Sequence, residues 1–289
     1  MSRSRVIYID VIRVVAMLAV VFAHSCANML IAGPTTRHWG LANILVTITT
    51  VAVPLFYMIS GVTILNSERT KNLSYLFKHR LPRILIPFLI WSLLSSIIFK
   101  LISGGLSFGS VLNSMLLIYH QPILTAYWFL YPLIGFYLLS PAIKAFVDNV
   151  DNNTMNYILI IWFITNIILP NTAKSLPTNS GQYFEVYGLG SLVFLSKMIG
   201  YFLLGYKLSH IKASNIRLSI NLSIFLIGLI ISITDSYIIS ARQLQDKPLS
   251  DILPPFYFQL LSVPYFLYSR NSKINIPNPS IDSLNSLHH

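Results

Sequence analysis

The chain has 289 residues, of which 54% are apolar and only 10% are charged, and its formal net charge is +11. Soluble domains contain about 25% charged residues, so this composition excludes an ordinary soluble protein and indicates a polytopic membrane protein. The basic residues flank apolar segments instead of forming one patch. This pattern argues against a nucleic-acid-binding protein and is typical of the Lys and Arg excess at the cytoplasmic ends of membrane spans.

The apolar segments predict an all-α fold with about eight transmembrane helices, because a helix needs roughly 20 mostly apolar residues to cross a membrane. The candidate spans are 11–31, 41–65, 84–103, 127–147, 155–170, 189–208, 217–239 and 252–269. Segment 110–121 is too short to cross and is expected to be re-entrant or interfacial. We therefore expect a transmembrane domain over 1–270 and a polar tail over 271–289, with the N-terminus in the cytoplasm.

Three ionisable side chains lie in or beside the first span: Asp10, Arg13 and His24. Arg13 and His24 are eleven residues apart, which at about 100° per residue brings them to nearly the same helix face, and Asp10 precedes Arg13 by three residues. Ionisable groups are costly in lipid and normally face a protein interior or a wet cavity. Two interpretations remain open here. One is a structural ion pair with a hydrogen-bonded histidine, and the other is a reactive site in which His24 accepts a proton near neutral pH.

A basic segment precedes the third span and contains Arg80 and Arg83 at the expected cytoplasmic entry to the membrane. Pro82, between them, is tolerated at the start of a helix. The guanidinium group matches the oxygen geometry of phosphate, so the pair suits a phosphate-bearing ligand. An anchor for lipid headgroups is an equally good interpretation of the same residues.

Three further residues are weak candidates for substrate contacts. Ser60 precedes Gly61 in the second span, where Pro54 predicts a kink and the glycine predicts close helix packing; no base stands at a recognisable spacing, which favours a packing serine. Trp128 is typical of an aromatic belt at the outer membrane surface. Glu185 lies in the outer loop before the sixth span, where it could pair with a cation or orient a hydroxyl. The sequence contains no cluster with metal-ligand spacing, so no metal is expected.

Together these segments resemble the acyltransferase family 3 membrane proteins, a bacterial family that includes O-acetyltransferases of surface polysaccharides such as O-antigen. The matching elements are Asp10-x-x-Arg13, Arg13-x10-His24, Pro54-Leu-Phe-Tyr-Met-Ile-Ser60-Gly61, Arg80-x-x-Arg83 followed by Ile-Pro87-Phe and Trp91, and Trp128-Phe129-Leu-Tyr131 leading into Gly135-Phe-Tyr-Leu-Leu-Ser-Pro141. Their order and spacing fit over about residues 5 to 145, and the hydropathy fits onward to about residue 270.

The resemblance implies transfer of an acyl group, usually acetyl, from acyl-CoA to a hydroxyl of a lipid-linked or cell-surface glycan. It implies that Arg80 and Arg83 hold the CoA phosphates and that His24 acts as general base. Asp10 and Arg13 would position the donor or each other. The implied partners are acyl-CoA, the glycan acceptor and membrane lipids, and the implied location is the bacterial cytoplasmic (inner) membrane.

The chain departs from this family at its C-terminal end. Members that look like it usually have about ten spans and a final helix with a Ser-Phe-Gly-Ile-Tyr-Leu-Ile-His-like stretch, whereas this sequence stops at Ser283-Leu-Asn-Ser-Leu-His-His289. Two alternatives to the acyltransferase therefore stay open: an exporter of a polysaccharide or small molecule, and an inactive truncated family member. The sequence shows neither inverted repeats nor paired broken helices, which weighs against an exporter.

Overall fold

The computed structural model describes residues 7–31, 35–176, 197–211 and 218–246. These residues form helices and no strand, which confirms the predicted all-α membrane fold. Among them, the helical segments long and apolar enough to cross a membrane are five: Tyr8–Cys26, Trp39–Leu65, Leu73–Ile102, Thr125–Asn149 and Asn152–Ala173. They correspond to the first five predicted spans.

The remaining predicted spans are described in part. The sixth and seventh correspond to α11 (Lys197–Ser209) and α12 (Leu218–Asp246). The eighth, 252–269, and the predicted polar tail, 271–289, lie outside the described residues.

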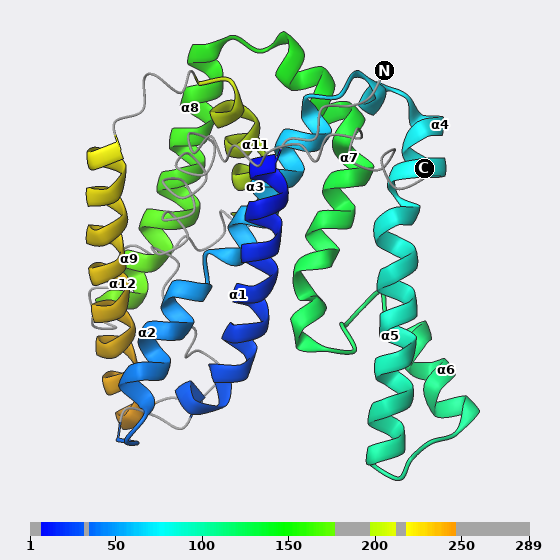
Figure 1. Cartoon of the computed structure of the whole chain (residues 1–289), viewed down its shortest axis with the longest axis vertical. Helices are drawn as coiled ribbons and strands as arrows, with labels where there is room; N and C mark the ends of the chain where they lie inside the picture. Colours follow the sequence, from blue (N-terminus) through cyan, green and yellow to red (C-terminus); the bar gives the residue numbers. More distant parts are fainter. Residues whose placement is uncertain (1–6, 32–34, 177–196, 212–217, 247–289) are drawn as a thin grey trace, which may run out of the picture.

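The long helices form a bundle in which successive helices alternate in direction (Figure 1). Before α11 and α12 the chain contains α1 (Ile7–Ile31), α2 (Trp39–Thr49), α3 (Ala52–Leu65), η1 (Glu68–Lys71), α4 (Leu73–Tyr75), η2 (Leu76–Arg80), α5 (Pro82–Ile102), α6 (Phe108–Leu116), η3 (Thr125–Phe129), α7 (Leu130–Asn149), α8 (Asn152–Phe163), η4 (Ile164–Ile168) and α9 (Leu169–Ser175). The start of α1, the η1 segment and the end of α7 lie at the same end of the bundle, at the top of Figure 1. We call this the η1 end.

The second span is interrupted near Pro54, where the sequence predicts a kink. α2 ends at Thr49 and α3 begins at Ala52, because Pro54 has no N–H to donate to the carbonyl of Thr50. The Thr50 hydroxyl donates to the Thr47 carbonyl at 2.8 Å, and the Thr49 hydroxyl lies 2.9 Å from the carbonyls of Leu45 and Val46. These hydroxyl groups add hydrogen bonds to carbonyls of the last turn before the break.

Two π-helical turns, η2 and η4, each end two residues before a proline, Pro82 and Pro170 respectively. Proline lacks the N–H of the regular ladder, and its ring presses on the carbonyl four residues earlier. The wider turn relieves that contact without ending the helix, so residues 73–102 form one continuous span. The η2 turn contains Lys78, His79 and Arg80.

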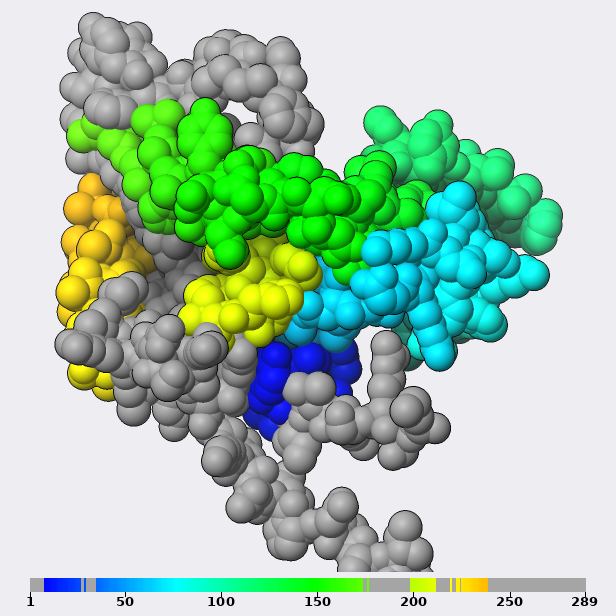
Figure 2. All heavy atoms as spheres, turned by 90° about the horizontal axis from the view of Figure 1, so that it is seen from above, coloured from blue at the N-terminus to red at the C-terminus, as the bar shows by residue number. Residues whose placement is uncertain are grey.

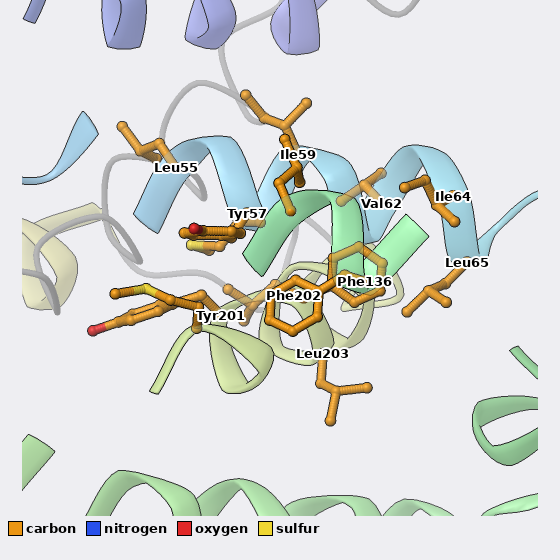
Figure 3. Packing of buried hydrophobic residues seen from close by; sticks show 14 of the residues in the cluster. Leu55, Tyr57, Ile59, Val62, Ile64, Leu65, Phe136, Tyr201, Phe202 and Leu203 are labelled. Atoms are coloured by element: carbon orange, nitrogen blue, oxygen red, sulfur yellow. The ribbon is translucent and has the colours of Figure 1, made fainter. Parts of the chain in front are cut away.

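The core forms where α3 crosses α11, and two glycines make this crossing possible. A Cβ on Gly61 would overlap the carbonyl oxygen of Phe202, and a Cβ on Gly205 would overlap the backbone of Met58. The expectation that Gly61 permits close backbone approach is thus confirmed. Figure 3 shows the buried side chains that fill the space around the crossing: Leu55, Tyr57, Ile59, Val62, Ile64, Leu65, Phe136, Tyr201, Phe202 and Leu203.

The predicted short segment after the third span is α6, which has only 9 residues and packs beside α5 (Figure 1). Its start is capped by Ser107, whose hydroxyl accepts from the backbone N–H of Ser110 at 3.1 Å. A helix of this length is too short to cross the membrane, in agreement with the sequence.

Candidate functional site

The charged stripe of α1 lies on the side of the helix that faces away from the core. α1 packs on α2 and α3 through Ile9, Ile12 and Ala16, which are almost completely buried. Arg13 and His24 are exposed, and the Arg13 side chain retains 46% of its accessible surface. Asp10 and Arg13 are neighbours, as their spacing predicts, because Arg13 Nη1 lies 3.1 Å from Asp10 Oδ1. The stripe is therefore reachable from outside the described helices, and it is not enclosed by them.

One ring nitrogen of His24 forms a hydrogen bond within α1. Its Nδ1 lies 2.8 Å from the carbonyl oxygen of Val20, and a carbonyl can only accept, so Nδ1 carries the hydrogen. In the neutral ring this leaves Nε2 as the unprotonated nitrogen, which is the form that a general base needs. His24 lies about 16 Å along the helix from Arg13, at 1.5 Å per residue.

Arg80 points from η2 toward the η1 segment. Its Nη1 donates to the hydroxyl of Thr70 at 2.7 Å, and its guanidinium group lies over the ring of Tyr75, 5.6 Å from the centroid. Arg69 approaches the same ring at 5.4 Å. The Arg80 head group is thus held by contacts at the η1 end.

Arg83 has different surroundings, although it follows Arg80 by only three residues. Together with Lys78 and His79 it lines an open pocket of about 480 Å³. The rest of this wall is apolar and consists of Pro82, Ile86 and Pro87. The structure therefore separates two arginines that the sequence suggested as a pair, since Arg80 is held by Thr70 and Arg83 lines a basic pocket.

Tyr137 of α7 is partly buried and packs against the core. Tyr137 was not singled out by the sequence as a site residue, although it lies inside the quoted segment Gly135–Pro141. That segment contains two hydroxyl side chains, Tyr137 and Ser140, among apolar residues.

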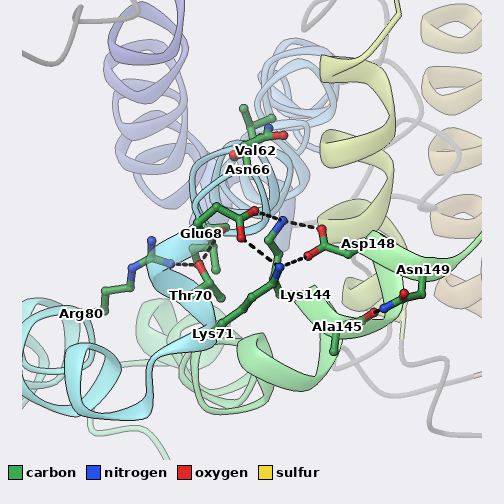
Figure 4. A network of polar contacts seen from close by, with 11 residues as sticks. Val62, Asn66, Glu68, Thr70, Lys71, Arg80, Lys144, Ala145, Asp148 and Asn149 are labelled. Atoms are coloured by element: carbon green, nitrogen blue, oxygen red, sulfur yellow. Dashed lines mark hydrogen bonds and ion pairs between the residues drawn. The ribbon is translucent and has the colours of Figure 1, made fainter.

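Four charged side chains form a closed ring at the η1 end, shown in Figure 4. Lys71 lies 2.9 Å from Glu68 and 2.7 Å from Asp148, while Lys144 lies 3.1 Å from Glu68 and also contacts Asp148. The Lys144 side chain is only 5% exposed. Because Glu68 and Lys71 belong to η1 and the other two belong to α7, the ring ties the η1 segment to α7.

The contribution of this ring to stability is expected to depend on pH at both extremes. Hydrogen bonds from Lys71 and Lys144 lower the pKa of Glu68 from 4.5, so its contribution is present above pH 4.5 and is lost as the pH falls through the lowered value. Hydrogen bonds to Asp148 and Glu68 raise the pKa of Lys71 above 10.5, so its contribution is present below pH 10.5 and is lost as the pH rises through the raised value.

We expect the difference in unfolding temperature between wild type and Glu68→Gln to stay constant from about pH 6 to about pH 9 and to shrink below about pH 4. Thermal unfolding of both proteins in the same detergent over that range measures this difference, which salt should also reduce because Glu68 is exposed. A difference that does not change with pH would contradict the assignment of the ring to these charges.

The remaining candidate residues lie apart from these groups. Ser60 is half-buried on α3. Trp128 is 38% exposed in η3, a segment that is fixed to α3 by a 2.7 Å hydrogen bond from the Tyr57 hydroxyl to the Phe129 carbonyl. Glu185 lies outside the described residues. No group of three or more His, Cys, Asp and Glu side chains suited to a metal ion occurs in the described part of the chain.

Comparison with known proteins gives one result. A family model described as an acyltransferase domain matches residues 6–278. Neither a curated protein nor a solved structure matches the chain significantly. The matched range includes α1 with its charged stripe, the η1 segment, η2, α5 and α7.

Proposed function

The chain belongs to acyltransferase family 3 and is a membrane acyltransferase, and from this premise we propose that it transfers an acyl group, acetyl, from acyl-CoA to a hydroxyl of a lipid-linked or cell-surface glycan. The observation that supports this proposal best is the group of basic side chains at the η1 end, where Arg80 is held by Thr70 and Arg83 lines a pocket with Lys78. Guanidinium and ammonium groups close together suit a ligand with several phosphate groups, as CoA has.

The donor would bind at the η1 end. The pocket with Lys78, His79 and Arg83 offers cationic groups for phosphate, and its apolar wall of Pro82 and Pro87 suits the flat face of a purine ring. Phosphate of a lipid headgroup has the same charge, so competition by CoA without the acyl group distinguishes a nucleotide site from a lipid anchor.

His24 would act deeper in the membrane. It lies about 16 Å from the level of Arg13, and the long pantetheine arm of CoA is the part of the donor that would bridge this separation. The Nε2 atom would accept the proton of the acceptor hydroxyl while the hydroxyl oxygen attacks the thioester carbonyl. The tetrahedral intermediate would then expel the CoA thiolate, which takes the proton back from the imidazolium as the ester forms.

Arg13 and Asp10 would serve the donor as a unit. Their 3.1 Å ion pair fixes the direction of the Arg13 guanidinium group, which has donors left over for a phosphate oxygen. The chain would lie in the bacterial cytoplasmic membrane with its N-terminus and the η1 end in the cytoplasm, where acyl-CoA is made. The basic residues of η1 and η2 at that end support this orientation.

The proposal is tested by release of the CoA thiol from acetyl-CoA by the purified full chain in lipid vesicles. We expect release to require an added glycolipid acceptor and to be inhibited by free CoA. A folded wild-type protein that releases no thiol with any membrane glycolipid extract would contradict the proposal. Transport of an unmodified glycan by the same vesicles would then favour an exporter.

A further inference from the structure

We infer that Thr70 is a positioning residue for Arg80 and that it acts by holding the guanidinium group in place before the acyl donor binds. This inference rests on the proposed function, because that function assigns Arg80 to the donor. Thr70 belongs to η1 and does not line the pocket that contains Arg83. The inference follows from the hydrogen bonds, the burial and the anchoring of η1.

The Thr70 hydroxyl has a fixed direction. Its Oγ1 lies 2.5 Å from the carbonyl oxygen of Ile64, which can only accept, so the hydroxyl hydrogen points to Ile64. A lone pair of the same oxygen is then left to accept the hydrogen of Arg80 Nη1 at 2.7 Å. Ile64 lies in the last turn of α3, and its carbonyl also accepts from the backbone N–H of Ser67 at 3.2 Å. The hydroxyl therefore connects the end of α3 to the Arg80 side chain (Figure 4).

Thr70 itself is held firmly. It is only 1% exposed, although the other members of its segment, Glu68, Arg69 and Lys71, are exposed. The ring of four charges ties this segment to α7, the helix that also contains Tyr137. Seen from above, the helical segment that contains α4 lies beside α7 (Figure 2). The ring and the hydrogen bond to Thr70 therefore fix the position of Arg80 relative to α7.

A second contact restricts the plane of the guanidinium group. Arg80 lies over the ring of Tyr75 at 5.6 Å, and the hydrogen bond to Thr70 fixes the direction in which its Nη1 points. An arginine with free rotation loses much rotamer freedom when it binds phosphate, whereas one that is already fixed loses less. Loss of the Thr70 acceptor should therefore weaken donor binding and leave the chemical step unchanged.

The test uses Thr70→Val, which keeps the shape and removes the hydroxyl. We expect the KM and the Kd for acetyl-CoA to rise about tenfold, the effect of one hydrogen bond to a charged group, with kcat within about twofold of wild type. Thr70→Ser, which restores the hydroxyl, should return both values to those of wild type. Thr70→Cys gives a weaker acceptor and an intermediate KM, and it replaces the valine variant if that variant does not accumulate.

Thr63→Val is the matched control. Its hydroxyl also donates to carbonyls of its own helix, those of Ile59 at 3.0 Å and Ser60 at 3.2 Å, but no arginine contact accompanies these bonds. This variant should leave the KM for acetyl-CoA unchanged. It thereby separates loss of a helix-bound hydroxyl from loss of the Arg80 contact.

The route through Arg80 is tested by a double-mutant cycle. If Thr70 acts through Arg80, Thr70→Val should not change the Kd for acetyl-CoA further when Arg80 is already glutamine. The inference would be overturned if the Thr70→Val protein bound acetyl-CoA with the Kd of wild type. It would also be overturned if Thr70→Val raised the Kd equally in the wild-type and the Arg80→Gln background. Neither outcome would affect the proposed function. A wild-type protein that neither binds nor consumes acetyl-CoA would overturn the proposed function, and this inference with it.

Discussion

Replacing His24 by alanine is expected to lower kcat for acyl transfer by about 10²- to 10⁴-fold and to leave the KM for acyl-CoA within about threefold of wild type. The ring supplies the general base, and its Nδ1 contact with the Val20 carbonyl keeps Nε2 as the accepting atom. The KM should stay close to that of wild type because the cationic groups assigned to the donor lie at the η1 end, about 16 Å away along α1. Steady-state kinetics of thiol release measures both constants.

Two further variants separate base chemistry from side-chain size. His24→Gln keeps a hydrogen-bonding side chain that cannot take up the proton, so its kcat should be as low as that of the alanine variant. His120→Gln is the control, because His120 lies outside α1, in the turn after α6, with its ring against that of Tyr119. Its kcat should match wild type. A His24→Gln enzyme with nearly full kcat would contradict the assignment of His24 as base.

Replacing Gly61 by alanine is expected to destabilise the fold by about 3 kcal/mol or to prevent accumulation in the membrane. The added methyl group would overlap the carbonyl oxygen of Phe202, and backbone atoms cannot rotate away as a side chain can. α3 and α11 would have to separate, which opens the core around Tyr57 and Phe202. The apparent unfolding temperature in detergent and the amount of membrane-inserted protein measure the effect.

Gly135→Ala is the matched control for this prediction. Gly135 also lies inside a membrane-spanning helix, α7, but a Cβ there would meet no atom within 4 Å. Alanine has the higher helix propensity, so this variant should be as stable as wild type or slightly more stable. Equal stability of Gly61→Ala and Gly135→Ala would show that α3 and α11 do not cross closely at Gly61.

Much of the backbone could be predicted because its signals are local. An apolar run of sufficient length identifies a span, and five of the predicted spans are confirmed as helices of that kind. Pro54 identified the break between α2 and α3, since its effect falls on a carbonyl four residues earlier in the chain. Gly61 indicated close packing, although the sequence did not identify Phe202 as the group it accommodates.

The surroundings of the site residues depend on contacts between distant segments, which periodicity does not show. The spacing of Arg13 and His24 gave a shared helix face, but only the packing of Ile12 and Ala16 shows that this face is the exposed one. Arg80 and Arg83 have the spacing of neighbours on an α-helix. The π-helical η2 turn ends at Arg80, which donates a hydrogen bond to Thr70, whereas Arg83 lines the basic pocket.

The ring of charges could not be predicted for a related reason. Lys144 and Asp148 show the i,i+4 spacing of a helical ion pair, but their partners Glu68 and Lys71 lie more than 70 residues earlier. Thr70 is an ordinary threonine between charged residues in the sequence. Its contacts with Ile64 and Arg80 arise only when η1 folds back against the end of α3.

Transfer of radiolabelled acetyl from acetyl-CoA to a membrane glycolipid, by the purified full chain in vesicles, tests the central claim most directly. We expect alkali-labile label in the glycan, one CoA thiol released for each ester formed, and loss of both in His24→Ala protein of equal unfolding temperature. The claim would be contradicted by a folded wild-type protein that moves an unmodified glycan across the vesicle membrane while acetyl-CoA remains intact.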